Sequence, residues 1–245
     1  MSVSCRTRIP ILVAQAVEAG VQGSNRNPTT EVVRIDPTNP DPVALAHAAD
    51  LIASGRVVAF PTDTVYGLAC RPDEPKAMDA VYEIKGRPRR LPLVLFIPAA
   101  DDLDRYAAEI TPELGRATHR FWPGPLTAIV RASERVPSAV VADGAVGIRV
   151  PSHPVALGLV RACGGALATT SANLSGQGAT DDPEQVLAQL RGRIVLLLDA
   201  GRAPGGVEST VVDFTERPPA VLRLGAIGAD ELRDVVGPVQ GPAAE

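Results

Sequence analysis

Residues 57–68 read VVAFPTDTVYGL, a short apolar run followed at once by a polar segment. Residues 57–60 have the length and the β-branched and aromatic content of a buried strand. A helix is predicted just before it, because Asp41-Pro42 offers an N-cap and a first-turn proline and Gly55 ends the apolar face. The chain therefore begins its regular structure with a helix, a buried strand and a polar strand end.

Helical and strand patterns continue to alternate along the chain. Further helices are predicted at 76–85, 112–122, 154–163 and 183–190, and further strands at 93–97, 126–131, 146–150, 166–169, 194–198, 210–214 and 220–224. Some strands follow one another without a helix, which favours a mixed-sheet α/β domain over a purely parallel doubly wound one. We place this domain at residues 41–236, with an N-terminal extension at 1–40 and a tail at 237–245.

The composition is that of an ordinary globular protein. The 245 residues carry a net charge of −4 and are 45% hydrophobic, enough for a substantial core. Three cysteines without a C-x-x-C motif exclude a disulfide scaffold and a zinc ribbon. The apolar stretch at 9–17 is too short to span a bilayer and lacks a clear cleavage site, so we expect a cytoplasmic protein without a membrane role.

Several common catalytic signatures are absent from the sequence. There is no G-x-x-x-x-G-K-[ST], no G-x-G-x-x-G and no G-x-S-x-G, which argues against a P-loop, a Rossmann fingerprint and an α/β-hydrolase. The three histidines, His47, His119 and His153, lie far apart and outside metal-ligand spacing. We therefore expect no metal site built from protein side chains alone.

Polar clusters follow several of the predicted strands. PTDTVYGL (61–68) brings together four hydrogen-bonding side chains, those of Thr62, Asp63, Thr64 and Tyr66. TTSANLSG (169–176) and GVEST (206–210) are similar clusters with small hydroxyls. Strand ends are the usual place for ligand contacts in α/β sheets. Polar turns that bind nothing would have a similar composition, so the pattern alone leaves both interpretations open.

Basic residues that could bind an anion lie at three places in the sequence. KGRPRR (85–90) holds four cations in six residues, and Arg149 and Arg223 each end an apolar strand. Lys85 and Arg87 are expected to point into one pocket, where lysine and arginine suit phosphate and carboxylate groups. A solvated basic surface is the alternative for these residues.

Taken in order, the segments resemble the YrdC-like family of threonylcarbamoyl-AMP synthases. The resemblance runs from about residue 41 to 225 and rests on PTDTVYGL, IKGRP with Pro92-Leu93, WPGPLT, GIRVP, TSANLSG, GVESTVVD and LRLG. Seven motifs in the same order make it specific. It implies an α/β YrdC-like fold, with a mixed twisted β-sheet, flanking helices and a concave central cavity.

The resemblance also implies an activity. Family members are nucleotidyltransferases that convert L-threonine, bicarbonate and ATP, with Mg²⁺ accompanying the ATP, into L-threonylcarbamoyladenylate and pyrophosphate. Downstream tRNA threonylcarbamoyl-transferase proteins then use the product to modify the adenosine beside the anticodon. Both the carbamate and ATP are anionic, so such a site must align them and offset their repulsion.

Site residues follow from the same resemblance. The family's K-x-R and S-x-N elements, expected to be catalytic, fall on Lys85, Arg87, Ser171 and Asn173. The expected threonine contacts are Thr62, Arg149, Ser171 and Ser209. The expected ATP contacts are Lys85, Asn173 and Arg223.

The sequence departs from the family at some positions. Leu95-Phe96-Ile97 stands where members commonly have a histidine, and Ala179-Thr180-Asp181 where they often have S-P-T. About twenty residues follow Gly225, so we expect a short form without the additional C-terminal domain of many long members. The alternatives are a relative that binds double-stranded RNA or tRNA, and a paralogue that carbamoylates a different acceptor.

Overall fold

The computed structural model describes residues 29–88 and 91–241. Its helices are α1 (Pro42–Ala53), α2 (Pro75–Lys85), α3 (Pro112–Phe121), α4 (Pro154–Ala162), α5 (Pro183–Leu190) and α6 (Ala229–Val236), with short 3₁₀ helices η1 (Ala100–Arg105) and η2 (Ser138–Val140). Its strands are β1 (Glu31–Arg34), β2 (Val58–Phe60), β3 (Gly67–Cys70), β4 (Val94–Phe96), β5 (Leu126–Arg131), β6 (Ala145–Arg149), β7 (Leu167–Ser171), β8 (Leu196–Asp199), β9 (Thr210–Asp213) and β10 (Ala220–Arg223).

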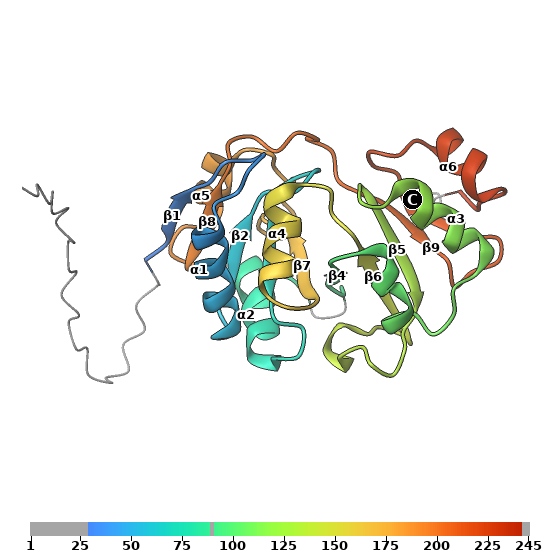
Figure 1. The fold of residues 1–245 in the computed structure, drawn as a ribbon, viewed down its shortest axis with the longest axis horizontal. Coiled ribbons are helices and arrows are strands. Elements are labelled where there is room, and N and C mark those ends of the chain that lie inside the picture. Colours follow the sequence, from blue (N-terminus) through green and yellow to red (C-terminus); the bar gives the residue numbers. More distant parts are fainter. Residues whose placement is uncertain (1–28, 89–90, 242–245) are drawn as a thin grey trace, which may run out of the picture.

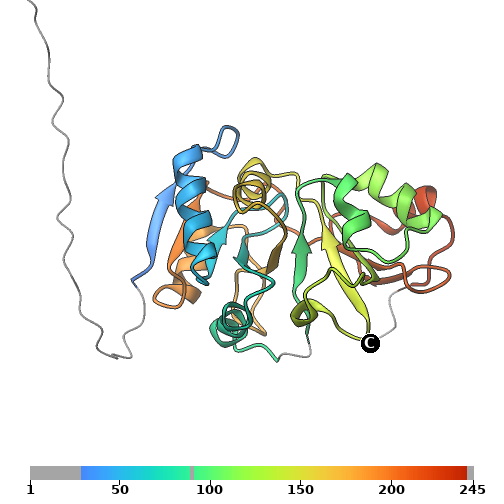
Figure 2. The ribbon, with the colours of Figure 1, turned by 60° about the horizontal axis from the view of Figure 1, so that its bottom comes forward.

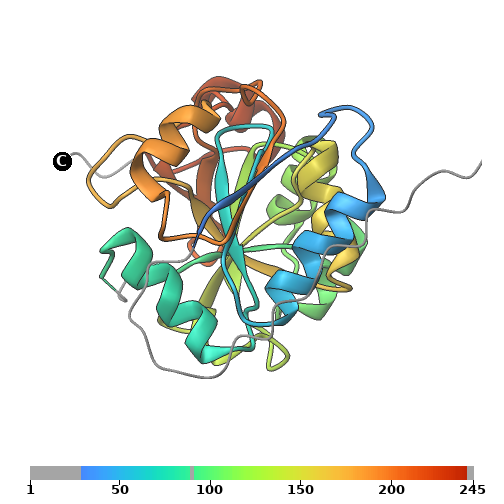
Figure 3. The same ribbon diagram turned by 90° about the vertical axis from the view of Figure 1, so that its left-hand side faces the viewer.

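Within the described residues, these ten strands form one mixed sheet in the order β1-β8-β2-β3-β7-β4-β6-β5-β9-β10. The β1/β8, β2/β8, β4/β6 and β5/β9 pairs are parallel. The other neighbours are antiparallel. The sheet twists along its length, with helices on both of its faces (Figures 1 and 3). The predicted mixed α/β fold is confirmed.

The two faces of the sheet have separate apolar cores. Helices α1 and α4 pack against each other on one face (Figure 2), while α2 and α5 lie on the other (Figure 3). Strand β2 serves both cores, because Val58 and Phe60 join the first and Ala59 joins the second. This is the alternation that a strand buried on both sides requires.

The helix boundaries follow the predicted capping residues. The Asp41 carboxylate accepts from the backbone N–H of Val43 at 3.0 Å, and the Thr111 hydroxyl accepts from that of Leu114 at 3.2 Å. Gly86 ends α2 in the left-handed conformation, with φ of 59°, which is easily adopted only by glycine. This sharp end of α2 directs the chain from Lys85 towards the sheet.

The fold begins earlier than the sequence analysis expects. Strand β1 precedes Asp41 and pairs with β8 at one edge of the sheet, so part of the predicted extension belongs to the domain. At the other end, the N–H of Gln240 donates to the carbonyl of Pro219, so the start of the predicted tail packs beside β10. The rest of those two predictions, at 1–28 and 242–245, lies outside the described residues, as do Arg89 and Arg90.

None of the helices in the described part of the chain combines the length and apolar character that crossing a bilayer needs.

Replacing Ile35 tests the early start of the domain. Ile35 is 6% exposed in the core beneath α1, and its N–H continues the β1/β8 ladder to the carbonyl of Asp199 at 2.9 Å. Ile35→Ala should lower the free energy of unfolding by about 2–4 kcal/mol, because it leaves a cavity. Val32→Ala, at a side chain 40% exposed on β1, should change it by less than about 0.5 kcal/mol. Urea unfolding measures both, and equal effects would contradict the assignment.

Candidate functional site

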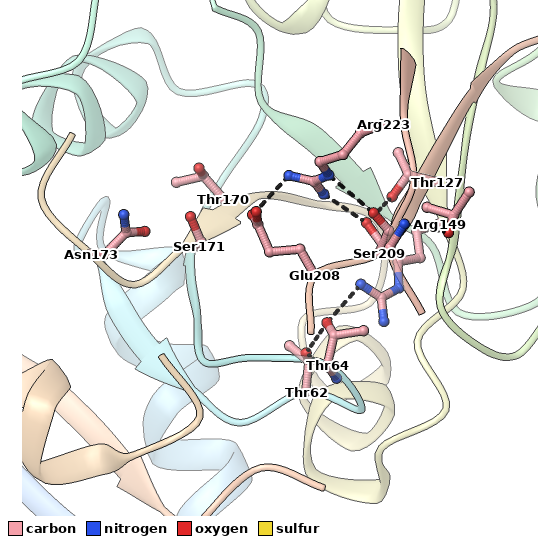
Figure 4. A network of polar contacts seen from close by, with 12 residues as sticks. Thr62, Thr64, Thr127, Arg149, Thr170, Ser171, Asn173, Glu208, Ser209 and Arg223 are labelled. Atoms are coloured by element: carbon pink, nitrogen blue, oxygen red, sulfur yellow. Dashed lines mark hydrogen bonds and ion pairs between the residues drawn. The ribbon is translucent and has the colours of Figure 1, made fainter. Parts of the chain in front are cut away.

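A cavity of about 750 Å³ opens at the middle of the sheet. Its walls come from β3 to β7, β9 and β10 and from the turns beside them. Six of the site residues predicted from the resemblance line it: Thr62, Arg87, Arg149, Ser171, Ser209 and Arg223. Segments far apart in the sequence therefore meet in one hollow (Figure 4).

Arg149 ends β6 and is 3% exposed. Its Nε donates to the carbonyl of Gly124 at 2.9 Å, its Nη1 to the hydroxyl of Thr64 at 3.1 Å, and its Nη2 to the carboxylate of Asp63 at 2.7 Å. The guanidinium also lies over the ring of Phe96, 5.4 Å from the ring centre. The three hydrogen bonds thus fix the guanidinium within its plane, and the ring of Phe96 packs against one of its faces.

Asp63 supplies the negative charge that this buried cation needs. Burial lowers the pKa of Arg149, and the neighbouring Asp63 carboxylate opposes that shift. The second oxygen of Asp63 accepts from the N–H of Ser152 at 3.1 Å. Because both oxygens are engaged, the carboxylate is fixed beside the arginine in the wall of the cavity.

Lys85 lies in the last turn of α2 and is 3% exposed. Its Nζ donates to the carbonyls of Ser171 and Asn173, at 2.5 and 2.7 Å, and to the side-chain oxygen of Asn173 at 3.2 Å. These three bonds match the three protons of an ammonium group. Lys85 and Asn173 are therefore joined to each other beside the cavity and do not line it, in contrast to the expectation that Lys85 and Arg87 share a pocket.

Arg87 does line the cavity. Its Nη1 donates to the hydroxyl of Thr170 at 3.1 Å and its Nη2 to the carbonyl of Pro92 at 3.4 Å. Its Nε is the one buried side-chain nitrogen or oxygen without a hydrogen-bond partner among the described residues. A buried donor is costly to leave unpaired, so the protein itself satisfies this guanidinium only in part.

A second polar network surrounds Arg223. Its Nη1 donates to Glu208 at 2.7 Å, and its Nε and Nη2 donate to the carbonyl and hydroxyl of Ser209 at 3.1 and 3.2 Å. The Ser209 hydroxyl also lies 2.9 Å from that of Thr127 (Figure 4). Arg223 and Glu208 are each about 40% exposed, so this pair is screened more than the Arg149 pair.

Four residues of the site received no role from the sequence: Asp63, Thr64, Thr127 and Glu208. All four lie within motifs that the resemblance rests on, so the motifs located them without revealing their partners. Phe96, at a position where the sequence departs from the family, lines the cavity beneath Arg149. The segment at 179–181, the other departure, does not line it.

The loop at 201–206 does not line the cavity. The N–H of Gly206 donates to the carbonyl of Thr64 at 2.8 Å, and the hydroxyl of Tyr66 donates to the carbonyl of Gly201 at 2.6 Å. A Cβ at Gly205 would lie 2.5 Å from the carbonyl oxygen of Asp63. The loop therefore fits closely against the back of the 63–66 segment and holds it in place.

Histidines and acidic residues form no metal centre in the part of the chain that is described. No group of three or more His, Cys, Asp or Glu side chains there is placed to hold a metal ion. His47 and His119 lie in α1 and α3, as expected, and the ring of His153 caps α4 by accepting from the N–H of Val155 at 3.2 Å.

Comparison with known proteins relates this cavity to one family. The model of the Sua5, YciO and YrdC proteins, described as "Telomere recombination", matches residues 50–225. The chain is 39% identical over 194 residues to threonylcarbamoyl-AMP synthase of Pyrococcus abyssi, which covers 79% of this chain and 57% of that protein. It is 37% identical to the synthase of Halorhodospira halophila, covering 76% of this chain and 97% of that protein.

A solved structure agrees with these sequence matches. P. abyssi Sua5 in complex with L-threonine superposes with a TM-score of 0.81 and 36% identity, covering 86% of this chain and 62% of that one. The chain thus spans less than two thirds of the P. abyssi protein.

A titration of Lys85 tests its burial. Desolvation, followed by the charge of Arg87, lowers the pKa of Lys85 to about 8. Between pH 8 and the ordinary lysine value the unfolded chain then binds more protons than the folded one, so stability should rise with pH relative to Lys85→Met.

NMR of the protein labelled with ¹³C-lysine measures this pKa directly, through the chemical shift of the Lys85 Cε. The chain has two lysines, so a Lys76→Arg variant leaves Lys85 as the only lysine signal. A midpoint near pH 8 is expected, and an ordinary lysine value would contradict the buried environment.

Proposed function

The chain belongs to the Sua5, YciO and YrdC family, and from that premise we propose that it is an L-threonylcarbamoyladenylate synthase. The reaction takes L-threonine, bicarbonate and ATP and releases pyrophosphate, which makes the protein a nucleotidyltransferase. The observation that carries the proposal is the cavity itself, because it joins a fixed carboxylate-binding arginine to a separate set of groups suited to phosphates. The names of the similar proteins, and the L-threonine held by the P. abyssi structure, support the same assignment.

Threonine is assigned to the wall that contains Arg149. A guanidinium binds a carboxylate through two parallel hydrogen bonds, which suits the α-carboxylate of an amino acid. The hydroxyls of Ser171 and Ser209 would contact the amine and the side chain, and Thr62 would line the same wall. All four residues lie at the cavity.

ATP is assigned to the wall that contains Arg87 and Arg223. The Nη groups of Arg87 each keep one N–H after their bonds to Thr170 and Pro92, and these would donate to a phosphate oxygen, while Arg223 would donate from its own place in the cavity wall. Lys85 and Asn173 act beside them: their bonds hold the Ser171–Asn173 segment, and Lys85 adds a positive charge close to the reacting groups. Mg²⁺ would enter with ATP as part of the substrate and keep several of its waters.

The proposed chemistry has two steps. The threonine amine attacks the carbon of bicarbonate, and loss of water gives a carbamate. A carbamate oxygen then attacks the α-phosphorus of ATP, the bond to the bridging oxygen of the β-phosphate breaks, and pyrophosphate leaves. Both reactants of the second step are anionic, so positioning and positive charge supply most of the catalysis.

The product defines the downstream partners. A mixed anhydride of a carbamate and a phosphate is an activated acyl donor, so the threonylcarbamoyl group would pass to an amine. Proteins that transfer it to the adenosine beside the anticodon of tRNA are the proposed recipients, in the cytoplasm. Binding of tRNA by this chain itself is not part of the proposal.

Pyrophosphate release tests the proposed function. Release from ATP should depend on both L-threonine and bicarbonate. Arg87→Ala should lose most turnover, roughly a hundredfold or more, because the lost group faces the transferring phosphate. Arg202→Ala is the matched control, since this arginine pairs with Asp181 outside the cavity and should keep wild-type turnover.

Two outcomes would count against this assignment. Pyrophosphate release that is independent of threonine would remove the substrate. Equal losses in Arg87→Ala and Arg202→Ala, with both variants folded, would remove the role of the cavity.

A further inference from the structure

Two threonine hydroxyls next to Arg149 form a chain of hydrogen bonds whose direction can be derived. The hydroxyl of Thr62 lies 2.6 Å from the carbonyl of Val65, and a carbonyl can only accept, so Thr62 donates there. A hydroxyl has one proton, so in the 2.9 Å contact between Thr62 and Thr64 the donor is Thr64. The proton of Thr64 is then engaged too, and its oxygen is left to accept from Arg149 at 3.1 Å.

The hydroxyl of Thr62 has no capacity left for a ligand in this arrangement. Besides donating to Val65, its oxygen accepts from both the N–H and the hydroxyl of Thr64. Its one proton and both lone pairs are therefore engaged. Thr62 can therefore influence a substrate only by positioning Thr64, and not by a hydrogen bond from its own hydroxyl.

Counting the hydrogen-bond donors of Arg149 in the same way shows how many of them remain for a ligand. A guanidinium has five N–H groups, and Gly124, Thr64 and Asp63 take three of them. The remaining two, one on each Nη, have no acceptor among the described residues. Because three of its N–H groups are bonded and Phe96 lies against its face, the guanidinium that carries these two donors is fixed at the cavity wall.

We propose that Thr62, Asp63 and Thr64 are positioning residues that hold Arg149 so that the site selects a carboxylate over a neutral amide. A carboxylate offers two acceptor oxygens to the two donors. A carboxamide offers one oxygen and an NH₂ group, which would set a donor against the second N–H. This inference rests on the proposed function, whose threonine substrate has the required carboxylate.

Asp63 and Thr64 are expected to act on Arg149 in different ways. Asp63 provides charge and orientation together, so changing it would mix two effects. Thr64 provides orientation alone, because its hydroxyl is neutral. Thr64→Val keeps the shape of the side chain and removes only the hydroxyl, which accepts from Arg149 and donates to Thr62, so it is the most informative variant.

The first experiment needs no substrate. NMR of the ¹⁵N-arginine-labelled protein, with the signals of Arg149 identified by their loss in Arg149→Lys, reports whether its Nη protons are held in place. They should be resolved in the wild-type protein and averaged by faster rotation in Thr64→Val. Averaged signals in the wild-type protein, or identical spectra in both, would overturn the proposal.

The second experiment measures the selectivity. Calorimetry gives the affinity for L-threonine and for L-threoninamide in the wild-type protein, in Thr64→Val and Thr62→Val, and in a control. Thr118→Val is that control, because it removes a buried hydroxyl that donates to Leu114 within α3, away from the cavity. The preference for threonine should fall by roughly tenfold in Thr64→Val, fall less in Thr62→Val, and stay at the wild-type value in Thr118→Val.

The outcomes separate this inference from the proposed function. If Thr64→Val weakens both ligands equally, or leaves the preference unchanged, the positioning role is wrong even though threonine binds. If the wild-type protein binds neither ligand, the proposed function fails, and the NMR experiment still decides whether Thr64 holds Arg149.

Discussion

The burial of one guanidinium group constrains this site more than any other interaction. Arg149 is almost inaccessible to water, so the protein must balance its charge and satisfy most of its donors. Its partners come from the turn after β2 and from the turn before β5. These two turns and the end of β6 are therefore fixed relative to one another, and together they form one wall of the cavity.

Lys85 likewise connects two separate segments of the site. Its ammonium group joins the end of α2 to the segment after β7, through bonds to Ser171 and Asn173. Arg87 and Arg223 are more accessible than these two buried cations and line the cavity. Four acidic residues also line it, namely Asp143, Glu208, Asp213 and Glu216, so the cavity contains both charges. Hydrogen bonds within the protein fix its cationic groups, the arrangement expected for catalysis by positioning and charge.

Local chemistry made most of the fold predictable. The helix that ends at Gly86 and the strand at 126–131 each carry a complete signal in their own residues. Strand β1 does not, because its four residues are mostly exposed and are defined by pairing with β8, far away in the sequence. Strand β3 was not predicted, for a related reason. It lies inside a motif noted for its polar residues, and its four buried residues form a strand because they pair with β2 and β7.

The site was predictable as a set of motifs but not as a set of contacts. The family resemblance named Lys85, yet its place beside the cavity depends on where the carbonyls of Ser171 and Asn173 lie. The bonds of Asp63 to Arg149 and Ser152 likewise depend on the packing of distant segments. Such pairings need three-dimensional geometry, which residue spacing does not contain.

Mass spectrometry of the reaction product is the sharpest test of the proposed synthase activity. The protein would be incubated with ATP, L-threonine and ¹³C-bicarbonate, and the nucleotide products analysed at once. A threonylcarbamoyl-AMP synthase should give a product one mass unit heavier than the product made with ordinary bicarbonate. A product without threonine, or one without the bicarbonate label, would contradict the proposed activity.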